Sequence, residues 1–302
     1  MSPRAFLIAG PTASGKTALA LDIAERVGGA VVNADSMQVY RDFRILTARP
    51  APQEESRAPH LLFGHVDASV NYSVGRWLAD FAATLADLDA RGLTPVVVGG
   101  TGMYFKAALQ GLSNIPAVPD AVRLAVRAAA QGKTPQQLYA ELAACDPQTA
   151  IRLRPTDPQR LLRALEVFAA TGKPLVAYQG PRNPPLLDAS ACRRVFLAPE
   201  RIALYARIDQ RYEKMIVDGA LDEVEALRAR RLDPTLPAMR AHGAPHLMEF
   251  LNGEISLSAA IARGQSDTRR YARRQFTFAR HQLPEFEWRT PDAAFAHLCA
   301  GL

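Results

Sequence analysis

Cysteine is scarce in this chain, and long apolar runs are absent from it. The three cysteines among its 302 residues, Cys145, Cys192 and Cys299, lack the spacing of a metal site. Because three cysteines cannot all pair within one chain, we expect a reduced, cytoplasmic setting. No apolar stretch reaches the length of a membrane span, and we expect no leader, because the first apolar run lacks a basic segment before it. These absences argue against a disulfide-stabilised secreted protein and against a membrane protein.

Histidine pairs with metal-ligand spacing are also lacking. The six histidines are dispersed, and His242 and His246 have Gly243 and Pro245 between them. The histidine pair of a metalloprotease lies on one uninterrupted helix, which this glycine and proline disfavour. We therefore expect no zinc site and no other metal cluster built from side chains.

Lysine is rare as well, so arginine carries most of the positive charge. Five of the 36 basic residues are lysine, and the formal net charge is +6. Arginine suits phosphate recognition and stacks on bases, which favours a nucleic-acid partner. Codon bias is the other explanation for the preference, because the chain is also rich in alanine. The positive net charge and its clustering are the stronger indication.

The chain does contain a complete phosphate-loop pattern near its start. A buried-strand pattern at residues 5–9 and a helical pattern from residue 18 enclose Gly10, Pro11, Thr12, Ala13, Ser14, Gly15, Lys16 and Thr17. Such a loop directs backbone N–H groups at phosphate oxygens, and its lysine adds a full charge. A tight glycine turn without a ligand is the weaker alternative in this context. The motif predicts a di- or triphosphate ligand, and an ATP-binding function would follow from the loop alone.

Two further apolar runs end in polar loops, as the first one does. Residues 30–34 lead to Asp35, and residues 95–98 lead to a glycine-rich turn that contains Thr101. Such runs, separated by helical stretches, predict an α/β fold of the P-loop NTPase type, with helices on both faces of a parallel sheet. Ligands of these sheets bind at the carboxyl ends of the strands. We therefore expect Lys16, Asp35 and Thr101 to surround one crevice.

A proline-rich break at residues 115–119 separates this sheet from a helical segment. Helices are predicted at 120–131, 135–144 and 158–171, before a second loop at 180–185. A strand at 194–198 then returns to the sheet, and the chain is mostly helical from 201 to 283. The sequence thus predicts a catalytic core of residues 1–116 and 188–302 and a helical insertion of residues 117–187.

Asp35 and Gln38 are the first candidates for chemistry at the crevice. A carboxylate that faces a phosphate loop can ligate a metal through water or act as a general base. The pair Asp35-Ser36 is equally typical of a helix cap or an Asx turn. The amide of Gln38 is able to recognise the edge of a base, although an isolated glutamine is more often a surface residue.

Two stretches are predicted to place arginines on helix surfaces. Gln159, Arg160 and Arg163 share a face of the predicted helix 158–171, which a solvated surface or pairing with Glu166 would also explain. Residues 269–281 interleave arginines with aromatic residues at helical spacing, a pattern expected at RNA contacts. Buried aromatics with solvated arginines are the alternative there. Together with the net charge, the second run favours RNA binding.

In combination, these motifs resemble the tRNA dimethylallyltransferases, also called tRNA isopentenyl-diphosphate transferases. The resemblance covers nearly the whole chain and rests on the order and spacing of segments 10–17, 35–41, 99–104, 157–167 and 270–275. It implies that the dimethylallyl group of dimethylallyl diphosphate is transferred to N6 of the adenosine just 3′ of the anticodon. Mg²⁺ is the implied cofactor, and diphosphate is the product.

The resemblance also implies roles for individual residues. Asp35 is the general base, and Lys16, Thr101 and Arg211 complete the catalytic set by holding the diphosphate. The loop 10–17 binds the diphosphate, and Thr17 ligates Mg²⁺. The protein acts as a monomer, and its helical insertion grips the tRNA anticodon stem-loop. Contact with tRNA is implied for Asp35, Ser36, Met37, Gln38, Thr101, Arg123, Gln159, Arg160, Leu161, Leu162, Arg163, Arg270, Arg273 and Arg274.

Two other functions fit parts of the same sequence. A small-metabolite kinase would use the loop for ATP, but it leaves the motif from Asp35 to Gln38 and the arginine-rich run unexplained. A non-catalytic RNA-binding switch would bind a nucleotide tightly, and Asp35 would be dispensable in it.

Three segments depart from the usual pattern of the family. Residues 243–246 read Gly-Ala-Pro-His where Gly-Tyr-Arg or Gly-Tyr-Lys is usual, Asp42 stands in place of glycine, and Phe278 in place of tryptophan. None of them belongs to the implied catalytic set, so the departures bear on local tRNA contacts.

Overall fold

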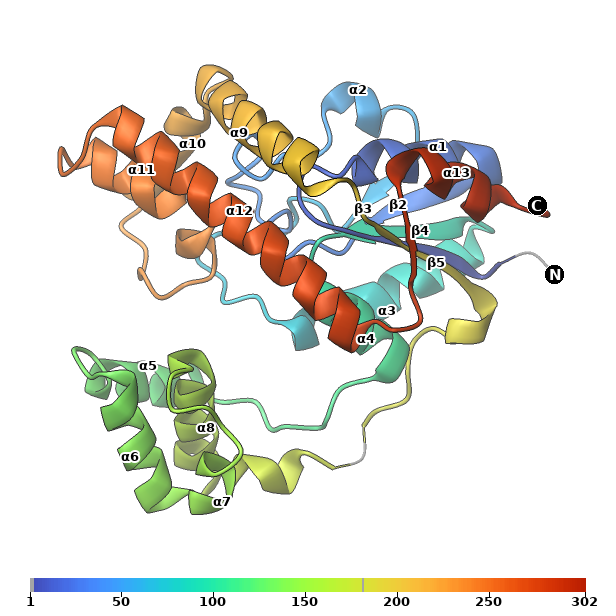
Figure 1. The fold of residues 1–302 in the computed structure, drawn as a ribbon. Coiled ribbons are helices and arrows are strands. Elements are labelled where there is room, and N and C mark those ends of the chain that lie inside the picture. Colours follow the sequence, from blue (N-terminus) through green and yellow to red (C-terminus); the bar gives the residue numbers. More distant parts are fainter. Residues whose placement is uncertain (1–2, 181) are drawn as a thin grey trace. The chain divides into compact units, whose positions relative to one another are not determined.

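A six-stranded parallel sheet, in the order β3-β2-β4-β1-β5-β6, runs through the larger part of the molecule (Figure 1). The structure is a computed structural model that describes residues 3–180 and 182–302. The four inner strands are those that the sequence predicts, because each is an apolar run able to be buried on both faces. The strands are β1 (Ala5–Ala9), β2 (Gly29–Asn33), β3 (His60–Leu61), β4 (Thr94–Gly99), β5 (Cys192–Leu197) and β6 (Glu287–Arg289). The predicted α/β fold class is confirmed.

The two edge strands were not predicted. β3 has two residues, both half-buried, and β6 has three, of which Glu287 is exposed. Segments this short and this polar carry no periodic apolar signal, and only their pairing with β2 and β5 makes them strands.

Helices cover both faces of the sheet. On one face, Phe6 and Ile8 of β1 pack in a core with α1 (Lys16–Val27) and α13 (Pro291–Cys299). On the other face, Leu7 packs in a core with α3 (Val74–Ala90), α4 (Gly102–Gln110) and the last turns of α12 (Leu257–Gln282). The sheet is therefore buried on both sides, which leaves the ends of its strands as the accessible positions for a ligand.

A further group of helices packs on the segment that follows β2. Helices α9 (Arg201–Val217), α10 (Ala220–Ala229) and α11 (Ala244–Leu251) share a core with Tyr40 and Phe43, both fully buried. The segment that begins at Asp35 therefore follows β2 directly and packs against these helices. The remaining short elements of this part are α2 (Pro52–Glu55) and the 3-10 helices η2 (Ala189–Ala191) and η3 (Ala238–Arg240).

The chain divides into two compact units. The first, called the core unit, extends to Leu109 and resumes at Pro185, and the second, called the helical unit, is Gln110–Pro184. The sequence predicts 117–187 for the helical segment. The difference arises because the two ends of the helical unit pair with each other: the N–H of Asn183 donates to Leu112 O at 2.9 Å. Leu187 belongs to the core unit, where its N–H donates to Ala108 O at 3.1 Å.

The helical unit has its own core. Its elements are α5 (Asp120–Ala129), α6 (Pro135–Cys145), α7 (Pro147–Ala150), α8 (Pro158–Thr171) and the 3-10 helix η1 (Leu175–Tyr178). Helix α8 has the predicted limits, because the Asp157 carboxylate accepts the N–H of Arg160 at its start and Gly172, with φ of 66°, ends it. Leu142 and Leu161 are fully buried at the centre of this unit.

Candidate active site at the carboxyl ends of the strands

The phosphate loop connects β1 to α1 in a tightly wound conformation. Gly15 has φ of 87° and immediately precedes α1, so a side chain there would be strained. Ala13 has φ of 61°, a left-handed conformation that a non-glycine residue adopts at a cost of about 1–2 kcal/mol. The hydroxyl of Ser14 is buried and has no hydrogen-bond partner among the described residues. A strained loop with an unpaired hydroxyl is suited to an anion that supplies the missing contact.

Lys16 lies inside this loop. Its Nζ donates to Pro11 O at 2.5 Å. Desolvation lowers the pKa of Lys16 to about 7; the nearby Asp35 carboxylate opposes this shift, and Arg211 adds to it. A bound diphosphate would raise this pKa again, because its negative charge favours the ammonium form.

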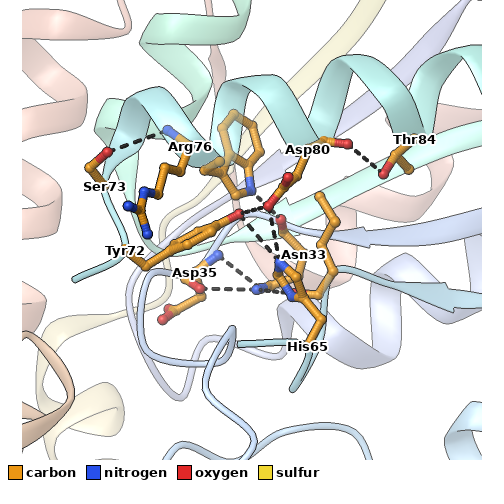
Figure 2. Close-up of polar contacts among 10 residues, drawn as sticks. Asn33, Asp35, His65, Tyr72, Ser73, Arg76, Asp80 and Thr84 are labelled. Carbon is orange, nitrogen blue, oxygen red and sulfur yellow. Dashed lines mark hydrogen bonds and ion pairs between the residues drawn. The ribbon is translucent and has the colours of Figure 1, made fainter. Parts of the chain in front are cut away.

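Asp35 follows β2, and its backbone is fixed by the side chain of Asn33 (Figure 2). Asn33 Oδ1 accepts the N–H of Asp35 at 2.8 Å, and Asn33 Nδ2 donates to Asp35 O at 3.0 Å. Trp77 Nε1 donates to Asn33 O at 2.9 Å, so α3 holds the end of the strand in place. Oδ1 of Asp35 accepts the N–H of Met37 at 2.9 Å, which forms the Asx turn that the sequence left open as an alternative. A rigid backbone and one engaged oxygen leave Oδ2 of Asp35 as the oxygen available to a ligand.

A second polar cluster secures α3 beside this strand end. The hydroxyl of Tyr72 donates to Asp80 Oδ2 at 2.5 Å, and His65 Nε2 lies 3.3 Å from the same oxygen. Figure 2 shows these side chains next to Asn33. Burial and the carboxylate of Asp80 raise the pKa of Tyr72 above its usual range, so the phenol stays protonated.

Thr101 joins the loop after β4 to the loop after β2. Its Oγ1 accepts the N–H of Ser36 at 2.9 Å and donates to Ser36 Oγ at 3.2 Å. The approach requires glycine at position 99, because a Cβ there would lie 2.1 Å from the backbone of Ala34. The structure thus brings Lys16, Asp35 and Thr101 to one rim, as the sequence predicts.

Arg211 reaches the same rim from α9. Its guanidinium donates to Thr12 Oγ1 in the phosphate loop. Desolvation lowers the pKa of Arg211 to about 10, and Asp35 opposes the shift, so the group stays charged at neutral pH. A desolvated cation beside the loop acts on a bound anion with little solvent screening.

Two of these groups, Asp35 and Arg211, line one pocket of mixed polar and apolar character. Thr12, Asp35 and Arg211 supply its polar wall, and Ile208 and Met215 are among its apolar residues. The full lining is Thr12, Asp35, Met37, Leu46, Thr47, Ile208, Arg211, Tyr212, Met215, His242, Thr268 and Tyr271. Such a pocket suits a ligand with an anionic head and a short hydrocarbon body.

Gln38 has a structural role that the sequence did not suggest. Its Nε2 donates to Thr47 O at 2.9 Å and to Ala48 O at 3.0 Å, which ties down the following loop. Recognition of a base by Gln38 would therefore use its remaining oxygen.

Four residues of the site were missed from the sequence: Asn33, His242, Tyr271 and Gln275. Tyr271 and Gln275 lie one helical turn apart in the arginine-rich run, and that spacing is a signal that they share a face of α12. The ring of His242 packs against that of Tyr271, with centroids 4.1 Å apart. Nothing in the sequence marks Asn33 or His242, because their partners lie on distant segments.

The segments that depart from the family pattern have structural roles. Gly243 has φ of 93°, and a Cβ on it would lie 2.4 Å from the hydroxyl of Tyr212. His246 Nε2 lies 2.9 Å from Asp267 Oδ2, which ties α11 to α12. Asp42 accepts the N–H of Ala68 at 2.9 Å. Phe278 fills the space beside Gly102, where a Cβ would lie 2.3 Å from its ring.

The arginine-rich face of α12 is exposed. Arg270, Arg273 and Arg274 all face solvent, and the guanidinium of Arg274 lies 5.6 Å from the ring centroid of Tyr271. The aromatics Tyr271, Phe276 and Phe278 are half-buried, whereas the exposed Arg270 pairs with Asp267 at 3.2 Å. Features of both interpretations that the sequence left open are therefore present.

In the helical unit, the candidate RNA-contacting residues divide by exposure. Gln159 and Arg160 are exposed, whereas Arg163 is half-buried and lies 3.8 Å from the buried Glu166. Arg123 pairs with Asp120 at 2.6 Å. Leu162 is half-buried against the core of this unit.

Leu161 requires a correction. Its side chain is fully buried in the core of the helical unit and cannot contact RNA, so its contribution is packing. It falls on the inward face because α8 turns about 100° at each residue, which separates it from its neighbour Arg160.

Hard oxygen ligands for Mg²⁺ are present in the phosphate loop. Thr17 lies in the first turn of α1, and the unpaired hydroxyl of Ser14 lies in the same loop. Mg²⁺ prefers such oxygens together with phosphate oxygens and water. No group of three or more His, Cys, Asp or Glu side chains with metal-site geometry occurs in the described part of the chain. The loop therefore fits a Mg²⁺ ion that is held mainly by the ligand's own phosphates.

Comparisons with known proteins agree with this site. A family model described as IPP transferase matches residues 38–282, and one described as isopentenyl transferase matches residues 3–60. The chain belongs to the IPP transferase family. The resemblance predicted from the motifs is thereby confirmed, as is the prediction of an enzyme of the tRNA dimethylallyltransferase type.

Curated members of the IPP transferase family are similar over the whole chain. The tRNA dimethylallyltransferase of Methylocella silvestris is 60% identical over 97% of this chain and 96% of its own. That of Methylobacterium nodulans is 59% identical over 100% of both chains.

Solved structures of the IPP transferase family share the fold. The full-length tRNA isopentenylpyrophosphate transferase of Bacillus halodurans has a TM-score of 0.68 at 31% identity, over 97% of this chain and 93% of that one. A eukaryotic dimethylallyltransferase described as acting on tRNA has a TM-score of 0.78 at 26% identity, over 98% and 76%. Across the described residues, no helix is both long enough and apolar enough to span a membrane.

Proposed function

We propose that this protein transfers the dimethylallyl group of dimethylallyl diphosphate to N6 of the adenosine just 3′ of the anticodon in tRNA. The observation that carries the proposal is the pocket that Asp35 and Arg211 line together, with the desolvated Lys16 close enough to interact with both charges. One wall provides a proton acceptor, and the other stabilises a polyanion. Apolar residues of the same pocket, Ile208 and Met215 among them, fit a five-carbon chain.

The transfer needs both walls at once. The lone pair of an exocyclic adenine amine is delocalised into the ring, so the amine is a weak nucleophile until a base accepts its proton. In the transfer, the N–C bond forms, the C–O bond to the diphosphate breaks, and the proton passes to Asp35 Oδ2. Removal of one oriented charge-stabilising donor of the kind that Lys16 and Arg211 represent typically costs about 3 kcal/mol, or about a hundredfold in rate.

Mg²⁺ fits this proposal as an ion that Thr17 and the diphosphate would ligate. When bound, it would neutralise part of the charge that develops on the leaving group. The positioning and the proton transfer depend on the chain's own residues.

The acceptor nucleotide must leave the stack of the anticodon loop to reach Asp35. We assign the binding of the stem-loop backbone to the exposed Gln159 and Arg160 and the half-buried Arg163 of the helical unit, and to Arg270, Arg273 and Arg274 of α12. We further propose that the protein acts as a monomer. A cytoplasmic location stays a prediction.

The experiment that tests the proposal is incubation with tRNA, Mg²⁺ and dimethylallyl diphosphate without ATP, followed by mass analysis of the nucleosides. We expect a prenylated adenosine, and we expect ATP to compete with the prenyl donor rather than to be consumed. An absolute requirement for ATP, with transfer of phosphate to a small metabolite, would instead establish the kinase alternative.

A further inference from the structure

Gln275 connects the two sides of the active site through a single side chain. It lies on α12, is 6% exposed, and its amide reaches two loops that are distant in sequence. Oε1 accepts the N–H of Thr12 in the phosphate loop at 3.0 Å. Nε2 donates to Gly100 O, in the loop after β4, at 2.9 Å. Its hydrogen-bonding groups are therefore engaged on both sides of the pocket.

The bond to Thr12 supports the strained part of the phosphate loop. Thr12 directly precedes Ala13, the residue with left-handed φ. Its N–H donates to Gln275, and its hydroxyl accepts from Arg211. Lys16 holds the adjacent Pro11 O at 2.5 Å. Three side chains from three elements thus fix this segment of the loop.

The bond to Gly100 fixes the acceptor side in the same way. The C=O of Gly100 accepts from Gln275, and the N–H of Thr101, from the same peptide, donates to Ala34 O at 3.1 Å. The hydroxyl of Tyr271 lies close to the side chains of both Thr101 and Gln275. This peptide therefore has no freedom to rotate while Gln275 is in place.

Position 100 is adapted to this contact. A Cβ there would lie 2.1 Å from Nε2 of Gln275 and 3.2 Å from Oδ2 of Asp35. Only glycine leaves room for the amide between the carboxylate and the phosphate loop.

We propose that Gln275 is a positioning residue that sets the spacing between the diphosphate site and the acceptor site. It does not touch the reacting atoms, and it acts through Thr12 and the peptide from Gly100 to Thr101. Arg273 and Arg274, on the same turn of α12, are exposed to solvent. The helix that we assign to RNA therefore also sets the geometry of the reaction. The inference rests on the proposed transfer reaction.

Two substitutions separate positioning from a merely structural role. Gln275→Met keeps the length of the side chain and removes both hydrogen bonds. Gln275→Glu keeps an acceptor for Thr12 and loses the donor to Gly100 O only while the carboxyl group is ionised. A protonated carboxyl group can accept from Thr12 and donate to Gly100 O, as the amide does.

We expect Gln275→Met to lower kcat about a hundredfold and to change KM for dimethylallyl diphosphate by less than about threefold, because misplacement of reacting groups costs rate more than binding. We expect the kcat of Gln275→Glu, divided by the wild-type kcat at the same pH, to rise at least about tenfold as the pH is lowered from about 8 to about 5.5. Burial raises the pKa of the introduced carboxyl group into this range, so the group is protonated at the lower pH. Gln275→Met shows no such recovery.

Gln265→Met is the matched control on the same helix. The amide of Gln265 contacts Asp209 O and Glu213 at 3.2 Å each, and it reaches neither the phosphate loop nor the loop after β4. We therefore expect the kcat of Gln265→Met to stay within about threefold of the wild-type value. If Gln275→Met keeps near-normal kcat, or if the ratio of Gln275→Glu to wild type is flat with pH, the inference is wrong. Should Gln275→Met fail to fold, the pH ratio measured on Gln275→Glu decides alone. Absence of product with wild-type protein would instead reject the proposed function.

Discussion

The core unit and the helical unit carry positive charge in different environments. In the core unit, Lys16 and Arg211 are desolvated, and their pKa values are lowered to about 7 and about 10. In the helical unit, Arg160 is exposed and its ion pair with Asp157 is open to solvent. Desolvated charges act strongly on a ligand a few ångströms away, whereas exposed charges are screened and act through binding. Substitutions of Lys16 and Arg211 should therefore change rate, and those of exposed arginines such as Arg160 should change affinity and its salt dependence.

The largest effect is expected at Asp35. Asp35→Asn keeps the shape of the side chain and an acceptor for the N–H of Met37, but it removes the base. We expect kcat to fall about a thousandfold, within the range typical of a lost general base, with tRNA affinity unchanged. Steady-state transfer and equilibrium tRNA binding measure the two quantities, and Asp22→Asn, on the exposed side of α1, is the control. A loss of tRNA affinity equal to the loss of rate would make Asp35 a binding residue.

Arg211→Gln should have the next largest effect. It removes a desolvated charge and the contact with Thr12, so we expect kcat to fall about a hundredfold. Arg207→Gln is a matched control, because this residue is exposed one turn earlier on α9. Equal losses in the two variants would show that only net charge matters and would remove the contrast between the units.

In the helical unit, joint replacement of Arg160 and Arg163 by alanine should weaken tRNA binding about tenfold while kcat at saturating tRNA stays near normal. Each lost phosphate contact should also reduce the slope of log affinity against log salt by about 0.7–0.9. Binding measured at several salt concentrations tests both. The control is joint replacement of the exposed Arg152 and Arg154, which removes the same charge. An unchanged slope would remove Arg160 and Arg163 from the interface.

The smallest expected effect is the uptake of a proton by Lys16 when the diphosphate binds. Because the pKa of ligand-free Lys16 is about 7, a large part of this group is neutral at pH 8, and diphosphate binding restores its charge. Binding should therefore take up as much as one proton at pH 8, and affinity should fall as pH rises above about 7. Calorimetry in buffers of different ionisation enthalpy measures the uptake. Lys16→Arg stays charged and should show none; equal uptake in both proteins would assign the proton elsewhere.

Much of the core unit could be predicted from sequence, because its signals are local. The four inner strands are continuous apolar runs, and Lys16, Asp35 and Thr101 each follow a strand end, so sheet topology alone brings them together. β3 and β6 carry too few residues for a periodic signal. Asn33 and His242 were missed because their partners lie on distant segments, and Gln275 carries only the helical spacing that it shares with Tyr271. Leu161 was misassigned because it adjoins true surface residues in a motif, although helical periodicity places it inside.

The most direct test of the account is transfer to an anticodon stem-loop in which the target adenosine is replaced by purine riboside, which lacks only the exocyclic amine. If the pocket sets the bound diphosphate against that amine, with Asp35 to accept its proton, the adenosine stem-loop is prenylated and the purine stem-loop binds equally well without product or diphosphate release. Prenylation of the purine stem-loop at a comparable rate would contradict the account.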